Sequence, residues 1–315
     1  MLTKSQVDQF ETQGFLVVEN LVDAAAITAI REEYSNRMDE LFDGWFAQGL
    51  VNAPPAGLSF WDKLEQCYRG GFDWYQPFDI SLPHHDIAAD TPMHIGPAVF
   101  GLITSAAILD VVEQLIGPEI TSNPIQHVRI KPPERAVPKT EARAHVTTTE
   151  WHQDMGVTLE EADHTNMVTV WLAITDAQIR HGCLEVAPGR RTDLLPHCTK
   201  SQVGIADAFL PAGKPVPTPV KSGGAVILNP FTPHASLPNT SGDFRWSMDL
   251  RYNVTGQPTG RSHFPEFVAR SRSNPGSELK DWREWRRMWK AARAHLSQAA
   301  HIPQHRWASD APYCA

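Results

Sequence analysis

Residues 244–252 read Phe-Arg-Trp-Ser-Met-Asp-Leu-Arg-Tyr, and apolar and polar side chains alternate throughout. Neighbouring side chains of a β-strand point to opposite faces, so this stretch predicts a strand with one apolar and one polar face. The apolar face has Phe244, Trp246, Met248, Leu250 and Tyr252, and the polar face has Arg245, Ser247, Asp249 and Arg251. The polar face either points to solvent or lines the mouth of a barrel that holds a polar ligand.

Similar segments recur between residues 120 and 252, with turn residues between them. Residues 127–131 alternate between a polar and an aliphatic face, and residues 167–174 also divide into two faces. Short strands at this spacing predict a mainly β fold with flanking helices, in which the aliphatic faces pack on the helices. The polar faces then line a barrel or jelly roll.

The regions before and after these strands predict helices. Thr3-Lys4-Ser5-Gln6 is typical of a capping box, and Gly14 ends the short helix before a buried strand at residues 15–18. Further helices are expected at about residues 24–41, 104–116 and 278–296.

Residues 43–97 are expected to form a long irregular loop, because they contain many prolines and glycines. Loops of this length in a compact domain are often lids or binding loops. We expect substrate contacts from this loop, with the following candidates: Trp74, Tyr75, His84, His85 and His94.

The composition of the 315-residue chain is that of an ordinary globular protein, with 42% hydrophobic residues. Its formal net charge of -8 disfavours nucleic acid and anionic membranes as partners. There is no signal-peptide pattern and no apolar run of membrane-spanning length. The four cysteines form no C-x-x-C pair. A cytoplasmic protein without disulfides is therefore expected.

No linker or internal repeat divides the chain, so we expect a single domain over residues 1–315. Residues 1–119 would form a helical flank and the long pocket loop. Residues 120–255 would form the jelly-roll core, and residues 256–315 a C-terminal helical extension.

The first chemical motif is Trp151-His152-Gln153-Asp154. On a strand, positions i and i+2 point the same way, so His152 and Asp154 would share a face and reach one cation. Taken alone this motif is weak, because a histidine beside an acid is more often a surface pair.

The second motif joins His234 to Arg245. His234 follows a short apolar strand at residues 225–228, and Arg245 lies further along on the polar face. A lone histidine in this position is more often structural. Two histidines and one aspartate, however, form the facial triad of non-haem Fe(II) oxygenases, which leaves coordination positions open. Arg245 adds a planar cation suited to a carboxylate.

Six stretches of the sequence share features with one protein family. They are residues 1–18, Lys131-Pro132-Pro133, residues 151–154, Trp171 to Asp176, Gly182 to Gly189, and His234-x-Ser236-x-x-Asn239-x-Ser241-x-x-x-Arg245 with Tyr252. In these stretches the chain resembles the phytanoyl-CoA dioxygenase (PhyH-like) family of Fe(II)/2-oxoglutarate-dependent dioxygenases. The resemblance covers almost the whole chain. Arg190 and Arg191 depart from it, since the family often has Ser-His there.

The resemblance implies a double-stranded β-helix (a cupin-like jelly roll) with flanking helices. It implies that Fe(II) is held by the catalytic residues His152, Asp154 and His234. It further implies cosubstrate-binding residues: Arg245 and Ser236 on the distal carboxylate of 2-oxoglutarate, Trp171 near the cosubstrate, and His127 on an inward-facing strand. The reaction would consume O2, oxidise a C–H bond of a small organic substrate, by hydroxylation or otherwise, and release succinate and CO2.

Two other classes of protein also fit parts of the pattern. A metal-dependent hydrolase usually has an H-x-H-x-D or H-E-x-x-H motif, and this sequence has neither. A non-catalytic jelly-roll binding protein should have lost a metal ligand, whereas all three are present. The sequence therefore favours the oxygenase, for which acyl-CoA thioesters, amino acids and secondary metabolites are all substrates that fit the family.

Overall fold

The main structural unit is a six-stranded antiparallel sheet with the strand order β1-β8-β3-β10-β2-β11. The structure is a computed structural model, and it describes residues 1–83, 85–136, 146–199 and 202–314. The strands of this sheet are β1 (Phe15–Val18), β2 (Glu119–Lys131), β3 (Met167–Ala173), β8 (Ala225–Leu228), β10 (Arg245–Val254) and β11 (Phe267–Ser271). Segments from both ends of the chain thus complete the central sheet.

Two smaller sheets lie beside the main one. The three-stranded sheet consists of β7 (Val216–Thr218), β4 (Leu184–Val186) and β9 (His234–Ser236), and the two-stranded sheet of β5 (His197–Thr199) and β6 (Val203–Ile205). An isolated bridge joins His152 to His234, which places the segment around residue 152 at the edge of β9. The expected mainly β architecture with flanking helices is confirmed.

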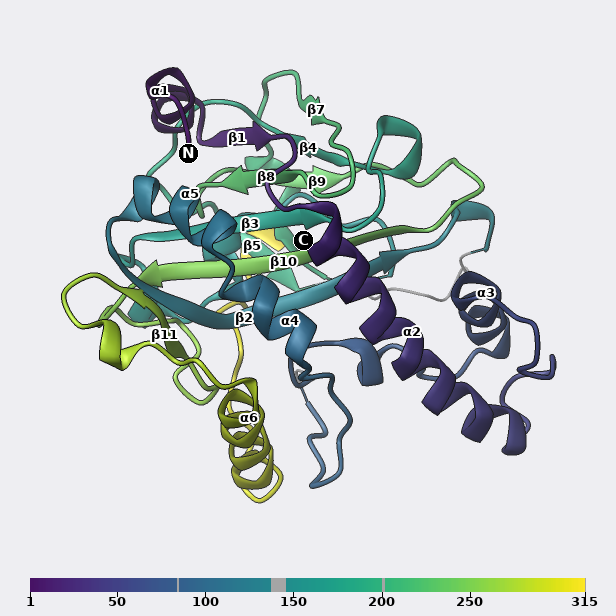
Figure 1. The fold of residues 1–315 in the computed structure, drawn as a ribbon. Helices are drawn as coiled ribbons and strands as arrows, with labels where there is room; N and C mark the ends of the chain where they lie inside the picture. The colour runs from purple at the N-terminus through teal and green to yellow at the C-terminus, as the bar shows by residue number, and fades with distance from the viewer. Residues whose placement is uncertain (84, 137–145, 200–201, 315) are drawn as a thin grey trace.

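Helices cover one face of the main sheet, and Figure 1 shows α4 and α5 lying across it. The helices are α1 (Lys4–Gln13), α2 (Ala24–Ala47), α3 (Phe60–Gly70), α4 (Pro97–Ile103), α5 (Ala106–Ile116) and α6 (Trp282–Leu296). The apolar face of β10 packs beneath them, where Trp246, Met248, Leu250 and Tyr252 are at most 1% exposed. This packing explains why one face of each central strand is apolar.

The polar face of β10 is buried too. Arg245, Ser247, Asp249 and Arg251 are all at most 3% exposed. Their neighbours on β2, in register, are Lys131, Arg129 and His127. The polar faces therefore line the interior between the sheets, and the solvent-facing alternative is wrong.

The first helix shows how local sequence positions the site. Thr3 and Gln6 form the predicted capping box, and Gly14 ends α1 with a positive φ of 77°. A Cβ at Gly14 would lie 2.4 Å from the Thr232 hydroxyl oxygen, so no larger residue fits there. The Gly14 carbonyl in turn accepts from the Thr232 hydroxyl at 2.7 Å and from Asn229 N at 2.8 Å. These contacts hold the segment that leads into His234.

Several predicted helix boundaries are wrong. Residues 43–97 contain α3, which begins with a capping box between Ser59 and Asp62 and buries Leu64 on one side. The helix α2 continues to Ala47, because Phe42 and Trp45 extend its buried stripe beyond the expected end. The last helix begins at Trp282 rather than residue 278.

Residues 97–116 are long and apolar enough to cross a membrane by length and composition, contrary to the prediction from the sequence. Half of this segment is buried within the protein. It forms two helices, α4 and α5, that separate at Thr104, and Ser105 caps the second. These helices belong to the core layer over the main sheet.

Cys198 and Cys314 form a disulfide, so the prediction of a chain without disulfides is wrong. Their Cα atoms lie 5.6 Å apart although 116 positions separate them in sequence. This distance suits a disulfide, and only the fold brings the two residues together. Cys67 and Cys183 are free and buried.

The apolar layer beneath the helices generates a stability prediction. Leu250→Ala is expected to lower the free energy of unfolding by about 3 kcal/mol, because it leaves a cavity between β10 and the helices. Urea unfolding followed by circular dichroism measures this change. A loss below about 1 kcal/mol would contradict the packing described for this face.

Candidate active site

The three candidate metal ligands come from two segments that are joined by backbone hydrogen bonds. His152 N donates to His234 O at 2.9 Å, and His234 N donates to His152 O at 2.9 Å. Asp154 begins the short 3-10 helix η3 (Asp154–Val157), so the expected strand over residues 151–154 does not form. Gln153 is nevertheless extended, with φ -111° and ψ 140°, and this conformation keeps His152 and Asp154 on the same side.

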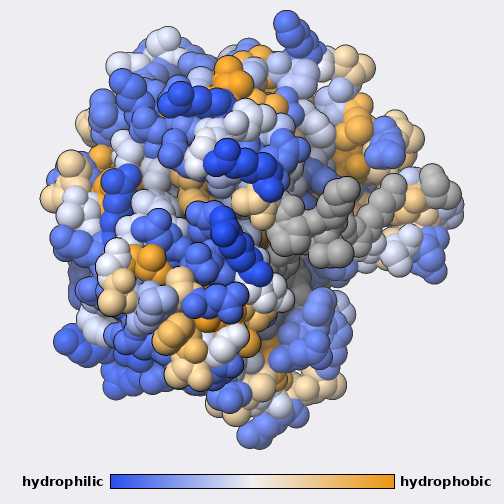
Figure 2. Space-filling view, turned by 90° about the vertical axis from the view of Figure 1, so that its right-hand side faces the viewer, coloured by the Kyte–Doolittle hydropathy of each residue, from blue (hydrophilic) through white to orange (hydrophobic). Residues whose placement is uncertain are grey.

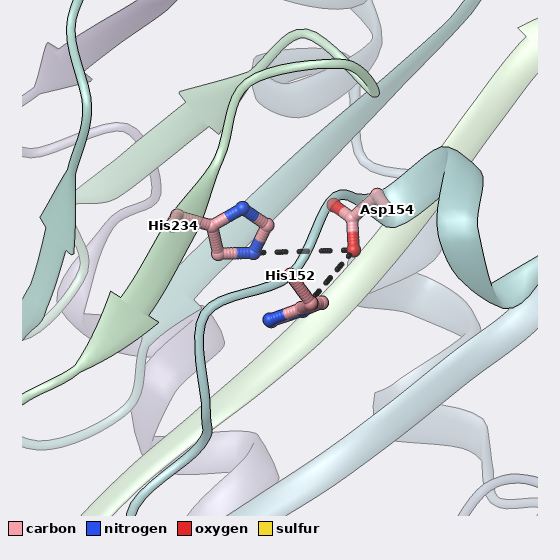
Figure 3. A group of neighbouring side chains, drawn as sticks. All are labelled: His152, Asp154 and His234. Atoms are coloured by element: carbon pink, nitrogen blue, oxygen red, sulfur yellow. Dashed lines mark ion pairs between the residues drawn. The ribbon is translucent and has the colours of Figure 1, made fainter. Parts of the chain in front are cut away.

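The three side chains meet in a buried cluster, and Figure 3 shows both imidazoles beside the carboxylate. Asp154 Oδ1 lies 3.8 Å from His152 Nε2 and 4.0 Å from His234 Nε2. The candidate ligand atoms all lie within 4.8 Å of one another. One cation could bind all three of them.

Both imidazoles are held with the same nitrogen facing the cluster. His152 Nδ1 donates to Glu150 O at 2.9 Å, and His234 Nδ1 donates to Thr232 O at 3.0 Å. A histidine that binds metal usually donates its other N–H to such an acceptor, which fixes the tautomer. Each Nε2 therefore presents its lone pair toward Asp154. Burial, then the neighbouring His234, lowers the pKa of His152 well below its ordinary value, which favours the neutral ligand form.

Asp154 is held by Arg251, a contact that the sequence analysis missed. Arg251 donates from one guanidinium nitrogen to Asp154 Oδ1 and from another to Ile125 O at 2.8 Å. Burial would raise the pKa of Asp154, but the ion pair with Arg251 outweighs it and holds that pKa well below its ordinary value. Asp154 Oδ2 is buried and has no hydrogen-bond partner. The carboxylate is thus ionised and has an oxygen available for a ligand.

Arg245 lies fully buried on the same interior face. Its hydrogen bond to Ser247 Oγ is long, at 3.4 Å, and its Nε has no partner. Among the residues that the structure describes, it forms no ion pair with a carboxylate. Burial, then the nearby Arg129, lowers the pKa of Arg245 to about 10. A buried cation in this state is costly unless a ligand anion joins it.

Ser236 is oriented by Lys131, which is the register neighbour of Arg245 on β2 and is another residue without an expected role in the site. Ser236 Oγ accepts from Lys131 Nζ at 2.6 Å and from Thr149 N at 2.8 Å. These two bonds occupy both lone pairs of the hydroxyl oxygen. The remaining hydrogen-bonding capacity of Ser236 is its hydroxyl hydrogen, which can donate to a further group. Burial, then Arg245, lowers the pKa of Lys131 well below its ordinary value. An anion placed beside them would relieve this repulsion.

Trp171 and His127 also face the interior. The Trp171 ring lies 5.1 Å from the Arg245 guanidinium carbon, and its indole N–H is buried without a partner. His127 Nδ1 lies 2.8 Å from Asp79 Oδ2, and burial, then Arg129, lowers the pKa of His127 well below its ordinary value. The family resemblance pointed to both positions, and the alternation along β2 and β3 is consistent with their facing the interior.

The candidates from the long loop are placed differently. Trp74 packs in the apolar core, with its ring centroid 4.8 Å from that of Tyr68. Tyr75 donates its hydroxyl to Val128 O at 2.5 Å. His94 Nε2 lies 2.8 Å from Glu33 on α2, and His85 lies beside His301. His84 falls outside the described residues.

The profile of the family described as phytanoyl-CoA dioxygenase (PhyH) matches residues 10–247, which is most of the chain. The chain belongs to the phytanoyl-CoA dioxygenase family. It is therefore an Fe(II)/2-oxoglutarate-dependent oxygenase, and the predicted family and enzyme class are confirmed. The matched region includes all three clustered ligands and Arg245.

Three solved structures resemble this family member along most of their length. The first is the non-heme monooxygenase ThoJ, with a TM-score of 0.58, 18% identity, and coverage of 93% of this chain and 98% of that one. The carbocyclase SnoK from nogalamycin biosynthesis gives a TM-score of 0.52 at 16% identity, with coverage of 89% and 94%. The epimerase SnoN, in complex with Fe3+ and alpha ketoglutarate, gives a TM-score of 0.50 at 18% identity. The match covers 82% of this chain and 86% of that one. Together with the family, these similarities confirm the double-stranded β-helix.

The buried histidines generate a pH prediction. Burial lowers the pKa of His127, of His152, and of His197 (to about 4), all from an ordinary 6.5. Below that value the unfolded chain binds protons on these histidines that the folded chain does not, so stability falls as the pH falls. Below this pH, each of the three histidines lowers the free energy of unfolding by roughly 1 kcal/mol per pH unit.

Urea unfolding of the metal-free protein between about pH 7.5 and about pH 5.5 measures this loss. His127→Gln removes one of the titrating groups and is expected to reduce the slope. Equal stability at both ends of this range would contradict the neutral, buried state of these histidines.

Proposed function

We propose that His152, Asp154 and His234 hold Fe(II), and that Arg245 binds the distal carboxylate of 2-oxoglutarate. The proposal rests on one observation: a buried triad of metal ligands shares its interior with a buried arginine that lacks an acidic partner among the described residues. Two histidines and one carboxylate are the facial triad of Fe(II) oxygenases. Arg245 offers the planar fork that binds a carboxylate with two hydrogen bonds.

The protein residues bind and orient the reactants. When bound, Fe(II) with 2-oxoglutarate and O2 supplies the oxidising chemistry at a substrate C–H bond, with release of succinate and CO2. Ser236 donates its free hydroxyl hydrogen to the same carboxylate as Arg245, since Lys131 and Thr149 occupy its acceptor positions. Trp171 lies against the Arg245 guanidinium and restricts its position. His127 faces the same interior and contacts cosubstrate or substrate.

The substrate is a small organic molecule, as is typical of the family. We propose oxidation of one of its C–H bonds, by hydroxylation or a related outcome. The carbocyclase and epimerase named above share the fold, and this machinery therefore supports more than one outcome. A metal-dependent hydrolase would not need Arg245, and a non-catalytic binding protein should have lost a metal ligand, so the site favours the oxygenase over both.

We propose that the chain acts as one domain over residues 1–315, with residues 120–255 as its jelly-roll core. Residues 1–119 and 256–315 flank it with helices and also add the edge strands β1 and β11 of the main sheet. Nucleic acid and membranes are not proposed as partners. On the face shown in Figure 2, apolar residues form separate small groups among hydrophilic ones.

The cytoplasmic location stays a prediction, and the disulfide weighs against it because disulfides are rare in the cytosol. The redox state of Cys198 and Cys314 in cells tests it.

Removing the guanidinium of Arg245 tests the cosubstrate site. Arg245→Met is expected to weaken 2-oxoglutarate binding by about two orders of magnitude, since charged hydrogen bonds contribute roughly 1.5–3 kcal/mol each. The charge-transfer band that appears when 2-oxoglutarate is added to the anaerobic Fe(II) protein measures this affinity. Succinate release then reports turnover.

Arg270→Met is the matched control, because Arg270 is also a buried arginine but pairs with Asp110 and Glu113 away from the interior. It is expected to leave the 2-oxoglutarate affinity unchanged. Wild-type 2-oxoglutarate affinity in Arg245→Met would disprove the proposed cosubstrate site.

A further inference from the structure

The C-terminal tail contacts the segment that carries two of the three metal ligands. We call residues 304–314 the C-terminal strap. Figure 1 shows the yellow tail passing from α6 behind the main sheet and ending beside β5. The strap lies outside residues 10–247, the part of the chain that matches the family.

The segment after the ligands belongs to no strand, although Met155 N donates to Pro230 O at 2.9 Å and Leu159 N donates to Gly260 O at 3.1 Å. One bridge at His152 joins it to β9, and the chain turns into η3 at Asp154. At the end of that turn, the three consecutive backbone carbonyls of residues 156–158 accept hydrogen bonds from side chains. Carbonyls at the end of a turn need donors from elsewhere.

The strap and Arg261, the residue that it holds, supply these donors. Trp307 Nε1 donates to Gly156 O at 2.6 Å, and Arg306 Nε donates to Thr158 O at 3.3 Å. The carbonyl of Val157 accepts from Arg261 at 2.8 Å. Arg261 is fully buried and donates in turn to the side chain and the backbone carbonyl of Gln304, at 2.9 Å and 3.0 Å.

Trp307 has a second route to the ligands through His197. The two rings are stacked, with centroids 5.1 Å apart and 27° between their planes. His197 is fully buried, and its Nε2 accepts from the backbone N of Gln153 at 3.0 Å. Gln153 stands between His152 and Asp154 in the chain. The packing is close, since a Cβ on Gly156 would lie 2.5 Å from His197 Nε2.

The far end of the strap is fixed covalently. Cys314 forms its disulfide with Cys198, the residue that follows His197 on β5. The strap is thus tied to the strand that carries its own stacking partner. Gln304 adds a hydrogen bond to Pro83 O at 3.1 Å at the other end.

We propose that the C-terminal strap positions the two metal ligands His152 and Asp154, and that Trp307 is its main positioning residue. Trp307 holds the turn after Asp154 through its indole N–H and the backbone before Asp154 through His197. This inference rests on the proposed metal site. Outer residues that orient metal ligands commonly change metal affinity by 10–100-fold when they are replaced.

Metal affinity of the otherwise intact chain tests the proposal. Co(II) is titrated into the metal-free protein by calorimetry, with circular dichroism confirming that each variant is folded. Trp307→Ala, which loses both contacts, is expected to weaken Co(II) binding about tenfold. Trp307→Phe keeps a ring against His197 but loses the N–H donor, so it is expected to give a smaller loss. Affinity for 2-oxoglutarate at saturating Co(II) is expected to stay unchanged, because Arg245 lies on another element.

Trp282→Ala is the matched control, because Trp282 is a half-buried tryptophan of α6 that contacts Arg283 and Arg286 instead of the ligand segment. It is expected to leave Co(II) affinity unchanged. Cys314→Ser, and wild type reduced with dithiothreitol that is then removed by anaerobic desalting, release the end of the strap. Both are expected to weaken Co(II) binding in the same direction as Trp307→Phe.

The outcomes distinguish a failure of the metal site from a failure of the strap. Wild-type protein that binds no Co(II) would overturn the metal site, and this inference with it. Wild-type protein that binds Co(II), with the same affinity in Trp307→Ala, would overturn the role of the strap and leave the metal site standing. If Trp307→Ala does not fold, unchanged Co(II) affinity in both Trp307→Phe and the reduced wild type would equally overturn the role of the strap.

Discussion

The reciprocal pair of backbone hydrogen bonds between His152 and His234 is the interaction on which the site depends. It fixes two segments, distant in sequence, side by side at the point where each presents an imidazole. The Nδ1 hydrogens of both rings then bind backbone carbonyls within two residues of their own positions. Ligand direction is thus set by main-chain geometry. The carboxylate of Asp154, by contrast, is bonded by another side chain, that of Arg251.

The rest of the interior is organised at a cost to stability. Buried arginine and lysine side chains are expensive, and the lowered pKa values of Arg245 and Lys131 record that burial and mutual repulsion act against their charges. The apolar layer on the opposite face of the same strands offsets this cost, since it packs under α4 and α5. One face of β10 therefore belongs to the stabilising core, and the other belongs to the site, whose buried charges lower the stability. Such departures from folding rules are expected at functional sites.

The sequence predicted this division because alternation along a strand is a local property. The strand at residues 244–252 and the motif around His152 could be read directly, and Arg245 and Ser236 followed from the family resemblance. The pairing of Arg251 with Asp154, the orientation of Ser236 by Lys131 and the Cys198–Cys314 disulfide could not be predicted, because each joins residues far apart in sequence. Helix α3 was missed since prolines and glycines around it outweighed its short apolar stripe.

Charge explains why metal and cosubstrate belong together in this interior. Fe(II) is a divalent cation and 2-oxoglutarate is a dianion, so the pair adds no net charge to a site that is already buried. The metal alone would add positive charge to an interior where Arg245, Lys131 and Arg129 already repel one another. The dianion alone would face the negative charge of Asp154 in the cluster. Bound together as proposed, the metal would face Asp154, and the distal carboxylate would balance Arg245. The arrangement of charges therefore favours coupled binding, in which either partner strengthens the affinity for the other.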